Sequence, residues 1–173
     1  HKPAGLVTTH KDERDRPTVF DNLPAGMPRV ISVGRLDLNS EGLLLLTNNG
    51  ELSRELELPK NAWSRRYRVR VHGRIDTKQL AGLQNGVTIE GAVYGNVSAV
   101  VDSQNGTNAW LTVTLNEGKN REIRKLMKFI GLEVTRLIRV SYGPFQLGNL
   151  AKGEVREVPL KVLKEQLGSR IAL

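Results

Sequence analysis

One acidic residue, Asp37, stands in a polar segment between two apolar runs, residues 30–33 and 43–46, and Arg35 lies two positions before it. A carboxylate fixed on a turn between two buried strands, beside an arginine, can be presented to a substrate, because catalytic residues often lie on loops that a rigid scaffold positions. Aspartate is also a common turn former whose side chain bonds the local backbone. Spacing alone favours this structural interpretation.

A second group of chemically useful residues lies in residues 121–130, which we predict to be a helix capped by Asn120 and ended by Gly131. Its apolar residues repeat at intervals of three and four and form one stripe: Ile123, Leu126, Met127 and Ile130. The cations repeat in the same way on the opposite face: Arg121, Arg124, Lys125 and Lys128. Such a basic stripe either binds phosphates or is simply a solvated helix face.

Residues 65–73 alternate with a period of two, which predicts a strand with one apolar and one basic face. Tyr67 falls on the apolar face with Val69 and Val71, so by pattern alone it is a core aromatic residue. Other short strands are expected at 30–33, 43–46, 97–101 and 110–115, with a loop longer than two residues around 104–106. Further helices are expected at 51–58, at 77–84 with Asp76 as N-cap, and at 159–167. We therefore predict an α+β fold: a central, mostly antiparallel mixed sheet flanked by helices, with the Asp37 turn in a cleft.

The composition restricts the classes of function. The 173 residues suffice for one well-buried core. The 26 Lys and Arg exceed the 18 Asp and Glu and leave a formal charge of +8, which favours a polyanionic partner, most commonly nucleic acid. The absence of cysteine excludes disulfides and thiolate chemistry. The histidines His1, His10 and His72 are scattered without metal-ligand spacing. No apolar run has the length of a membrane span, and we expect a cytoplasmic protein.

Several segments, in the same order along the chain, resemble the pseudouridine synthases, in particular the branch that modifies bacterial ribosomal RNA and is typified by RsuA and RluB. The most specific of them is GRLDLNSEGLLLLT at 34–47. The others are HKPAG at 1–5, RPTVFD at 16–21, RRYRVRVHG at 65–73, NEGKNREIRKLMKFIG at 116–131 and VTRLIRVSYGPFQLGNLAKGEVREV at 134–158.

The resemblance implies an isomerase that breaks the bond between uracil and ribose, turns the base and rejoins it through carbon 5. It needs no metal, cofactor or energy source. In this family Asp37 would be the essential catalytic residue, Arg124 would lie beside it and keep it ionised, and Tyr67 would stack on the base. Ile123 and Leu137 would complete the base pocket.

The implied partner is ribosomal RNA, and the sequence after residue 65 resembles the type that acts on 23S RNA more than the type that acts on 16S RNA. We expect the RNA to be held through its phosphates by two basic groups and by Arg35. The first group is Arg65, Arg66, Arg68 and Arg70, and the second is Lys119, Arg121, Lys125 and Lys128. Residues 1–173 would form one catalytic domain that acts as a monomer, without the small RNA-binding module that usually precedes it in this branch.

Three alternatives remain open. The target could be 16S RNA. The chain could be a non-catalytic RNA-binding factor for ribosome assembly that keeps the fold, although such a factor would be expected to have lost one of the three implied catalytic residues. Finally, Asp37 and Glu41 could be a carboxylate pair of the kind that N-glycosylases use, which would release free uracil.

Overall fold

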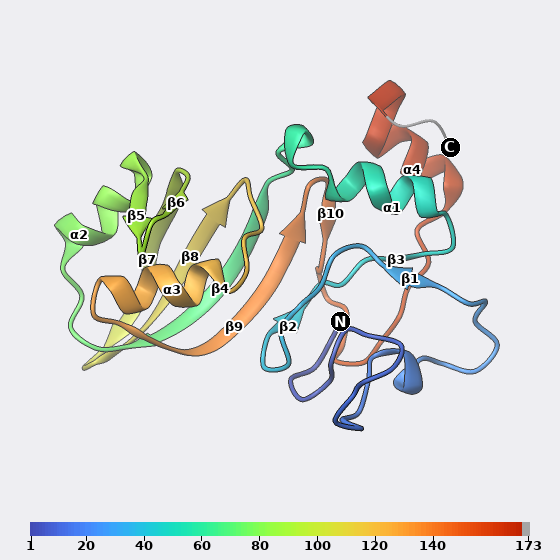
Figure 1. Ribbon diagram of the computed structural model, residues 1–173, viewed down its shortest axis with the longest axis horizontal. Coiled ribbons are helices and arrows are strands. Elements are labelled where there is room, and N and C mark those ends of the chain that lie inside the picture. The colour runs from blue at the N-terminus through green and yellow to red at the C-terminus, as the bar shows by residue number, and fades with distance from the viewer. Residues whose placement is uncertain (171–173) are drawn as a thin grey trace. The chain divides into compact units, whose positions relative to one another are not determined.

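The computed structural model describes residues 1–170, which divide into two compact units. The terminal unit contains His1–Ala62 and the chain from Pro144 onward, and the middle unit is Trp63–Gly143. Figure 1 shows the elements of each. The class is α+β, as predicted.

The middle unit is built on four antiparallel strands in the order β9-β4-β8-β7. Their bounds are β4 (Arg65–His72), β7 (Val97–Asn105), β8 (Asn108–Leu115) and β9 (Glu133–Tyr142). The strand predicted from the alternation at 65–73 is confirmed. Its apolar residues Val69 and Val71 are fully buried, whereas Arg66, Arg68 and Arg70 are exposed. One face of β4 therefore belongs to the core and the other does not.

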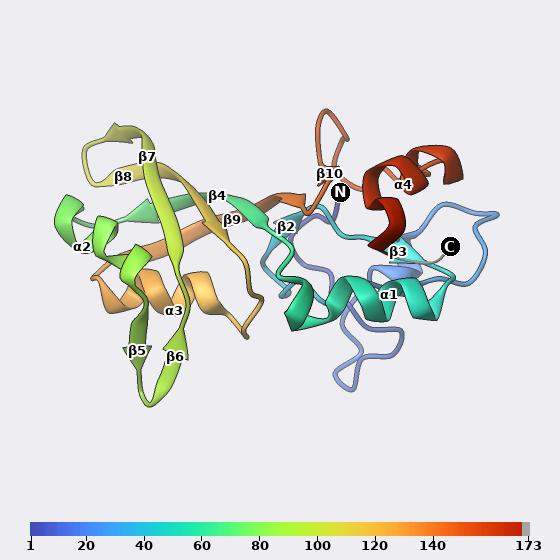
Figure 2. The ribbon, with the colours of Figure 1, turned by 90° about the horizontal axis from the view of Figure 1, so that it is seen from above.

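The core face of this sheet is covered by α3 (Glu122–Phe129), by α2 (Thr77–Gly82) and by a hairpin of β5 (Val87–Ile89) and β6 (Ala92–Tyr94). Figures 1 and 2 both place α3 and the hairpin on the same side of the sheet. From α3, Leu126 and Met127 enter the core with no exposed surface. The apolar stripe predicted for this helix is thus confirmed.

Of the two predicted helix caps, one is confirmed and the other is wrong. Asp76 caps α2 as expected, because its carboxylate accepts from the N–H groups of Lys78 and Gln79 at 2.9 and 3.3 Å. Asn120 does not cap α3, contrary to the prediction. The N-cap residue is Arg121, in a left-handed conformation with φ 52°, and no side chain caps the helix end. The chain reaches α3 through a tight backbone turn, which leaves no place for an asparagine cap.

The strands β7 and β8 correct another prediction. Asn105 pairs with Asn108, so only Gly106 and Thr107 form the turn, whereas a longer loop was expected. The reason is that the polar residues 102–104 continue strand β7 instead of leaving it. Gly106 takes φ 61°, which glycine adopts without strain.

The terminal unit has short elements: β1 (Ile31–Ser32), β2 (Glu41–Gly42), β3 (Leu46–Thr47), β10 (Phe145–Gln146), α1 (Gly50–Glu57), α4 (Leu160–Leu167) and the 3-10 turn Phe20–Asn22. The helices lie where they were predicted. The strand predicted at 43–46 is wrong except for Leu46, which pairs with Ser32 of β1. Just before this run Gly42 pairs with Lys2, and within it the carbonyl of Leu45 accepts from the N–H of Val33 at 2.9 Å, so the run does not form one continuous strand.

The ends of the middle unit lie side by side. Gly143 donates its N–H to the carbonyl of Ser64 at 2.7 Å. With φ 55°, Gly143 also packs so closely on Trp63 that an added Cβ would lie 2.7 Å from Cε3 of the indole. Only glycine fits here. Within residues 1–170, no helix is long and apolar enough to cross a bilayer.

We predict that Leu126→Ala lowers the free energy of unfolding by about 2–5 kcal/mol, because it leaves a cavity under α3. Phe129→Ala is the control on the same helix, since this ring is 56% exposed. It should cost less than about 1 kcal/mol. Urea denaturation measures both, and equal losses would contradict the assigned core.

Candidate active site

Asp37 lies on a turn in the terminal unit, outside regular strands. Its carbonyl accepts from the N–H of Ser40 at 3.0 Å, which closes the turn. Leu36 is buried, Asp37 is half-buried and Arg35 is exposed. An acid held this way is fixed by its backbone while its side chain keeps partial access to solvent.

The N-terminal segment holds this turn along its length. Lys2 and Gly42 exchange backbone hydrogen bonds of 2.8 and 2.9 Å, and the N–H of Gly5 bonds to the carbonyl of Leu38 at 2.8 Å. On the other side of Asp37, the buried Thr8 hydroxyl donates to the carbonyl of Leu36 at 2.9 Å. Residues on both sides of the acid are therefore attached to one segment.

The ammonium group of Lys2 also contacts this turn. Its Nζ donates to the carbonyls of Ser40 at 2.7 Å, Pro3 at 2.9 Å and Leu38 at 3.1 Å. Lys2 is 3% exposed, and this burial lowers its pKa to about 8 against the opposing charges of Glu41 and Asp37. Lys2 therefore holds the backbone of this turn, a role that our sequence analysis did not single out.

Glu41, the second carboxylate of the N-glycosylase alternative, takes part in an ion pair. It is buried, and its Oε1 lies 3.3 Å from Nζ of Lys152. A general acid must carry a proton to deliver, whereas a carboxylate in an ion pair serves as an ionised anchor. This contact weakens the carboxylate-pair interpretation.

In the middle unit, Tyr67 lies on the core face of β4 and packs, half-buried, against the core that contains Ile123 and Leu137. Its partner on β9 is Arg139, so the two side chains share this face. Arg139 is 4% exposed, and its guanidinium lies 5.1 Å from the ring of Tyr142. A buried arginine beside the implied base-stacking residue was missed, because only the register of β9 reveals it.

The cations of α3 lie as the spacing predicted, on its less buried side. Arg124 is half-buried, and Arg121, Lys125 and Lys128 are exposed. Three of them, Arg121, Arg124 and Lys128, line a shallow cavity of about 470 Å³ beside Glu133. Ile123 points the other way, into the core, where it is 4% exposed.

The loop before α3 is held by a pair of carboxyl groups. Glu117 accepts from the N–H of Gly95 at 2.6 Å and lies 3.5 Å from the ammonium of Lys119. Glu122 is 3% exposed and accepts from the N–H of Lys119 at 3.3 Å.

The pKa values of the two carboxyl groups are shifted in opposite directions. Burial, followed by the neighbouring Glu117, raises the pKa of Glu122 to about 8. Burial also acts to raise the pKa of Glu117, but the bonds from Gly95 and Glu122 and the charge of Lys119 leave it lowered. At neutral pH Glu122 is therefore the protonated partner of an ionised Glu117.

The arginines of β4 do not form the single group that we expected. Arg65 lies against Tyr142, with its guanidinium 4.8 Å from the ring and Nη2 3.1 Å from the hydroxyl. Arg66, Arg68 and Arg70 project from the face opposite to Tyr67.

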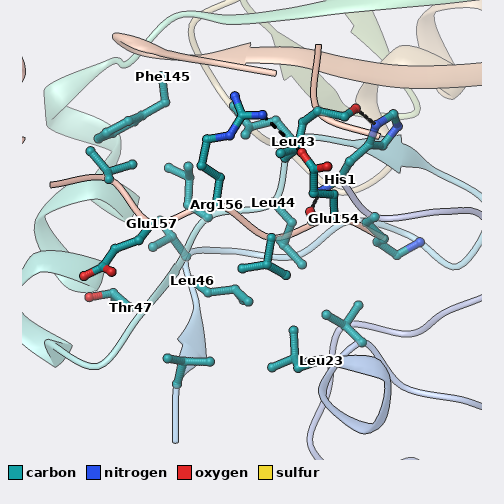
Figure 3. A pocket seen from close by; sticks show the side chains of 18 of the residues that line it. His1, Leu23, Leu43, Leu44, Leu46, Thr47, Phe145, Glu154, Arg156 and Glu157 are labelled. Atoms are coloured by element: carbon teal, nitrogen blue, oxygen red, sulfur yellow. Dashed lines mark hydrogen bonds and ion pairs between the residues drawn. The ribbon is translucent and has the colours of Figure 1, made fainter. Parts of the chain in front are cut away.

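A large cavity of about 1140 Å³ lies in the terminal unit. Figure 3 shows its apolar wall, which includes Leu23, Leu43, Leu44 and Leu46, and the ion pair of Arg156 with Glu154 at its rim. None of the predicted catalytic or RNA-binding residues lines it.

Comparison with known proteins decides the family. Residues 1–129 match the family model described as RNA pseudouridylate synthase. The chain belongs to this family. An uncharacterised RNA pseudouridine synthase of Rickettsia bellii is 52% identical to this synthase over 164 residues, which cover 95% of the chain and 71% of the relative.

Two further comparisons extend this result. The ribosomal large subunit pseudouridine synthase B of Yersinia pestis is 43% identical over 163 residues, covering 93% of our synthase and 51% of that protein. A crystal structure of a pseudouridylate synthase superposes with a TM-score of 0.82 at 25% identity, over 96% of this chain and 70% of that one. The expected family, fold and isomerase class are thus confirmed.

We predict that Lys2→Met lowers the free energy of unfolding by about 2–3 kcal/mol, because buried carbonyls lose a charged donor. Lys161→Met, at an exposed residue of α4, is the control and should cost less than about 1 kcal/mol. Thermal unfolding compares the two, and an equal effect would show that Lys2 does not anchor the turn.

We also predict a pH-dependent difference between Glu122→Gln and the wild type. The folded wild type keeps the proton of Glu122 up to a pKa of about 8, whereas the unfolded chain releases it near 4.5. Wild-type stability therefore falls as pH rises through this window, by up to about 1.4 kcal/mol per unit of pKa difference. Glutamine cannot ionise but can donate to Glu117.

The variant should gain stability relative to the wild type between these pH values in denaturant titrations. Gln84→Ala, which changes no titratable group, should give a difference that does not change with pH. A constant difference for Glu122→Gln as well would contradict the raised pKa of Glu122.

Proposed function

We propose that this synthase isomerises specific uridines in ribosomal RNA of the large subunit, and that it acts in the cytoplasm, where ribosomes are assembled. The support is the likeness to the large subunit synthase B. The small-subunit target remains the nearest alternative, because the family model alone does not distinguish the two. The strongly basic composition suits either RNA.

In the proposed reaction the bond between N1 of uracil and C1′ of ribose breaks, the base turns, and C5 bonds to C1′. The proton on C5 passes to solvent, and N1 gains a proton, so substrate and product are isomers. Asp37 is the proposed catalytic group and acts on the ribose or the base as the bond breaks. The protein must supply orientation and charge, but no redox partner.

The observation that carries this proposal is the way the Asp37 turn is held. Lys2 and Gly5 bond to its backbone, and Thr8 bonds beside it. Structural turns on a protein surface do not require a buried ammonium beneath them. The bonds from Lys2 give the turn one conformation, which suits a site that presents a carboxylate in a fixed position, because small displacements of a reacting group cost large factors in rate.

We further propose that Tyr67 stacks on the extruded uracil and that Arg124 favours the ionised form of Asp37. Ile123 and Leu137 would then support Tyr67 from the core, and Arg139, its neighbour on β9, would fix the edge of the ring. The basic residues of α3 would hold the phosphates around the uridine. These roles favour an enzyme over a non-catalytic assembly factor, because a factor that only binds RNA has no use for Asp37.

The test is tritium release from rRNA labelled at C5 of uridine. We predict that Asp37→Asn releases none while its RNA affinity stays near that of the wild type, because phosphate contacts dominate binding. Asp21→Asn, at an exposed carboxylate, is the control and should turn over normally. Turnover by Asp37→Asn would exclude the assigned role, and mapping the modified uridine would distinguish large-subunit from small-subunit RNA.

A further inference from the structure

The middle-unit sheet has a second face whose composition differs from that of its core face. We call it the open face and define it by side chains of β4, β8 and β9: Arg66, Arg68, Arg70, Trp110, Thr112, Thr114 and Arg136. These residues are exposed or half-buried. Figure 2 shows that, among the described residues of this unit, no helix lies against this side of the sheet.

The strand register explains why these residues gather. Arg70 pairs with Trp110 on β8 and with Arg136 on β9, while Arg68 pairs with Thr112. Partners in an antiparallel ladder project from the same side. The arginines of β4 alternate with buried residues, so they must all leave the sheet on the side away from α3.

The open face is strongly positive. Four guanidinium groups lie on it, and the acidic groups that face them are Asp102 on β7 and, at the margin, Glu133 opposite His72. Asp102 lies 3.6 Å from Nε of Arg68 and also accepts from the Thr112 hydroxyl at 2.6 Å. Arg68 itself is 45% exposed in its side chain, so this single pair does not neutralise the face.

The spacing suits a nucleic-acid backbone. Arginines two residues apart on a strand repeat every 6.6 Å or so, a rough value from the rise of about 3.3 Å per residue. This repeat is comparable with the separation of successive phosphates along a nucleic-acid strand. Guanidinium groups form bidentate hydrogen bonds with phosphates, and the threonine hydroxyls add further donors.

Trp110 adds a surface for bases. Its ring lies in the open face with the guanidinium of Arg68 at 5.0 Å from its centroid. An aromatic ring beside an arginine is the arrangement on which an unpaired base stacks. An acidic protein partner would use the arginines but would have less use for a regular repeat beside an aromatic ring.

The open face is separate from the uridine chemistry. Tyr67 projects from the opposite side of the same strand, against the core beneath α3. A nucleotide stacked on Tyr67 therefore cannot also contact Arg66 or Arg68 through the sheet.

We propose that the open face binds the sugar–phosphate backbone of a second stretch of ribosomal RNA, distinct from the one that contains the target uridine. This proposal rests on rRNA being the substrate. The middle unit would then bind RNA on both faces of its sheet. The face of Tyr67 would receive the target nucleotide, and the open face would favour long, folded RNA over isolated hairpins.

The test compares RNA binding by two triple variants with the same loss of charge. The open-face variant is Arg66→Gln, Arg68→Gln and Arg70→Gln. The control is Lys60→Gln, Lys161→Gln and Lys164→Gln, at exposed residues of the terminal unit. Both are made in the full chain with Asp37→Asn, so that no RNA is modified during the titration. The probes are 23S rRNA and a hairpin excised from it, each over a range of salt concentrations.

We expect the open-face variant to bind 23S rRNA roughly tenfold more weakly, with a slope of log affinity against log salt reduced by about 2–3, one unit for each lost phosphate contact. Hairpin affinity and the control variant should not change. A salt slope equal to that of the control, or an equal loss on the hairpin, would overturn the proposal. Retained 23S affinity with lost binding to ribosomal particles would overturn it in favour of a protein partner.

A variant that is expected to bind more tightly separates lost contacts from misfolding, because a misfolded protein would not gain affinity. Asp102→Asn removes the acidic group that faces Arg68 but can still accept from Thr112, so it should tighten 23S rRNA binding several-fold. Unchanged or weaker binding would contradict the proposal. Because binding is measured without turnover, a wild type that forms no pseudouridine would refute the proposed function while leaving this result in place.

Discussion

The fixed position of the Asp37 turn depends on one buried ammonium group. Removing a lysine from water is costly unless acceptors and opposite charge compensate. Lys2 has three carbonyl acceptors, and the carboxylates of Glu41 and Asp37 lower the remaining cost. The compensation works only if the turn keeps one conformation, because the carbonyls of Leu38 and Ser40 must both point at Nζ. The lysine and the acid therefore constrain each other.

Strand β4 is the corresponding constraint in the middle unit. Each of its residues faces either the core or solvent, so a displacement by one position would bury three guanidinium groups and expose Val69 and Val71. Such a strand cannot slip. Its register with β9 then determines which residue stands beside Tyr67, and this residue is Arg139. The positions of Tyr67 and Arg139 on one face are thus fixed by the cost of burying the arginines of the other face.

Much of this could be predicted from sequence, and the failures have identifiable causes. Alternation located β4 and the helical spacing located α3, because both patterns are imposed by burial of a single face. Asp37 emerged through family resemblance, since spacing alone favoured a structural turn. The role of Lys2 was not predictable, because its partners are backbone carbonyls, which every residue has. The hairpin β5–β6 was missed because three-residue strands with exposed side chains such as Val93 give no periodic signal.

The contact between Gly143 and Trp63 has a consequence for the architecture of the chain. These residues are the last and the first of the middle unit, and the Gly143–Ser64 hydrogen bond brings its entry and exit together. A segment whose ends meet can be inserted into, or excised from, a host fold without stretching either one. Residues 63–143 therefore have the geometry of an inserted domain. Gly143 allows its two ends to meet, because a single methyl group at position 143 would collide with Trp63 and separate them.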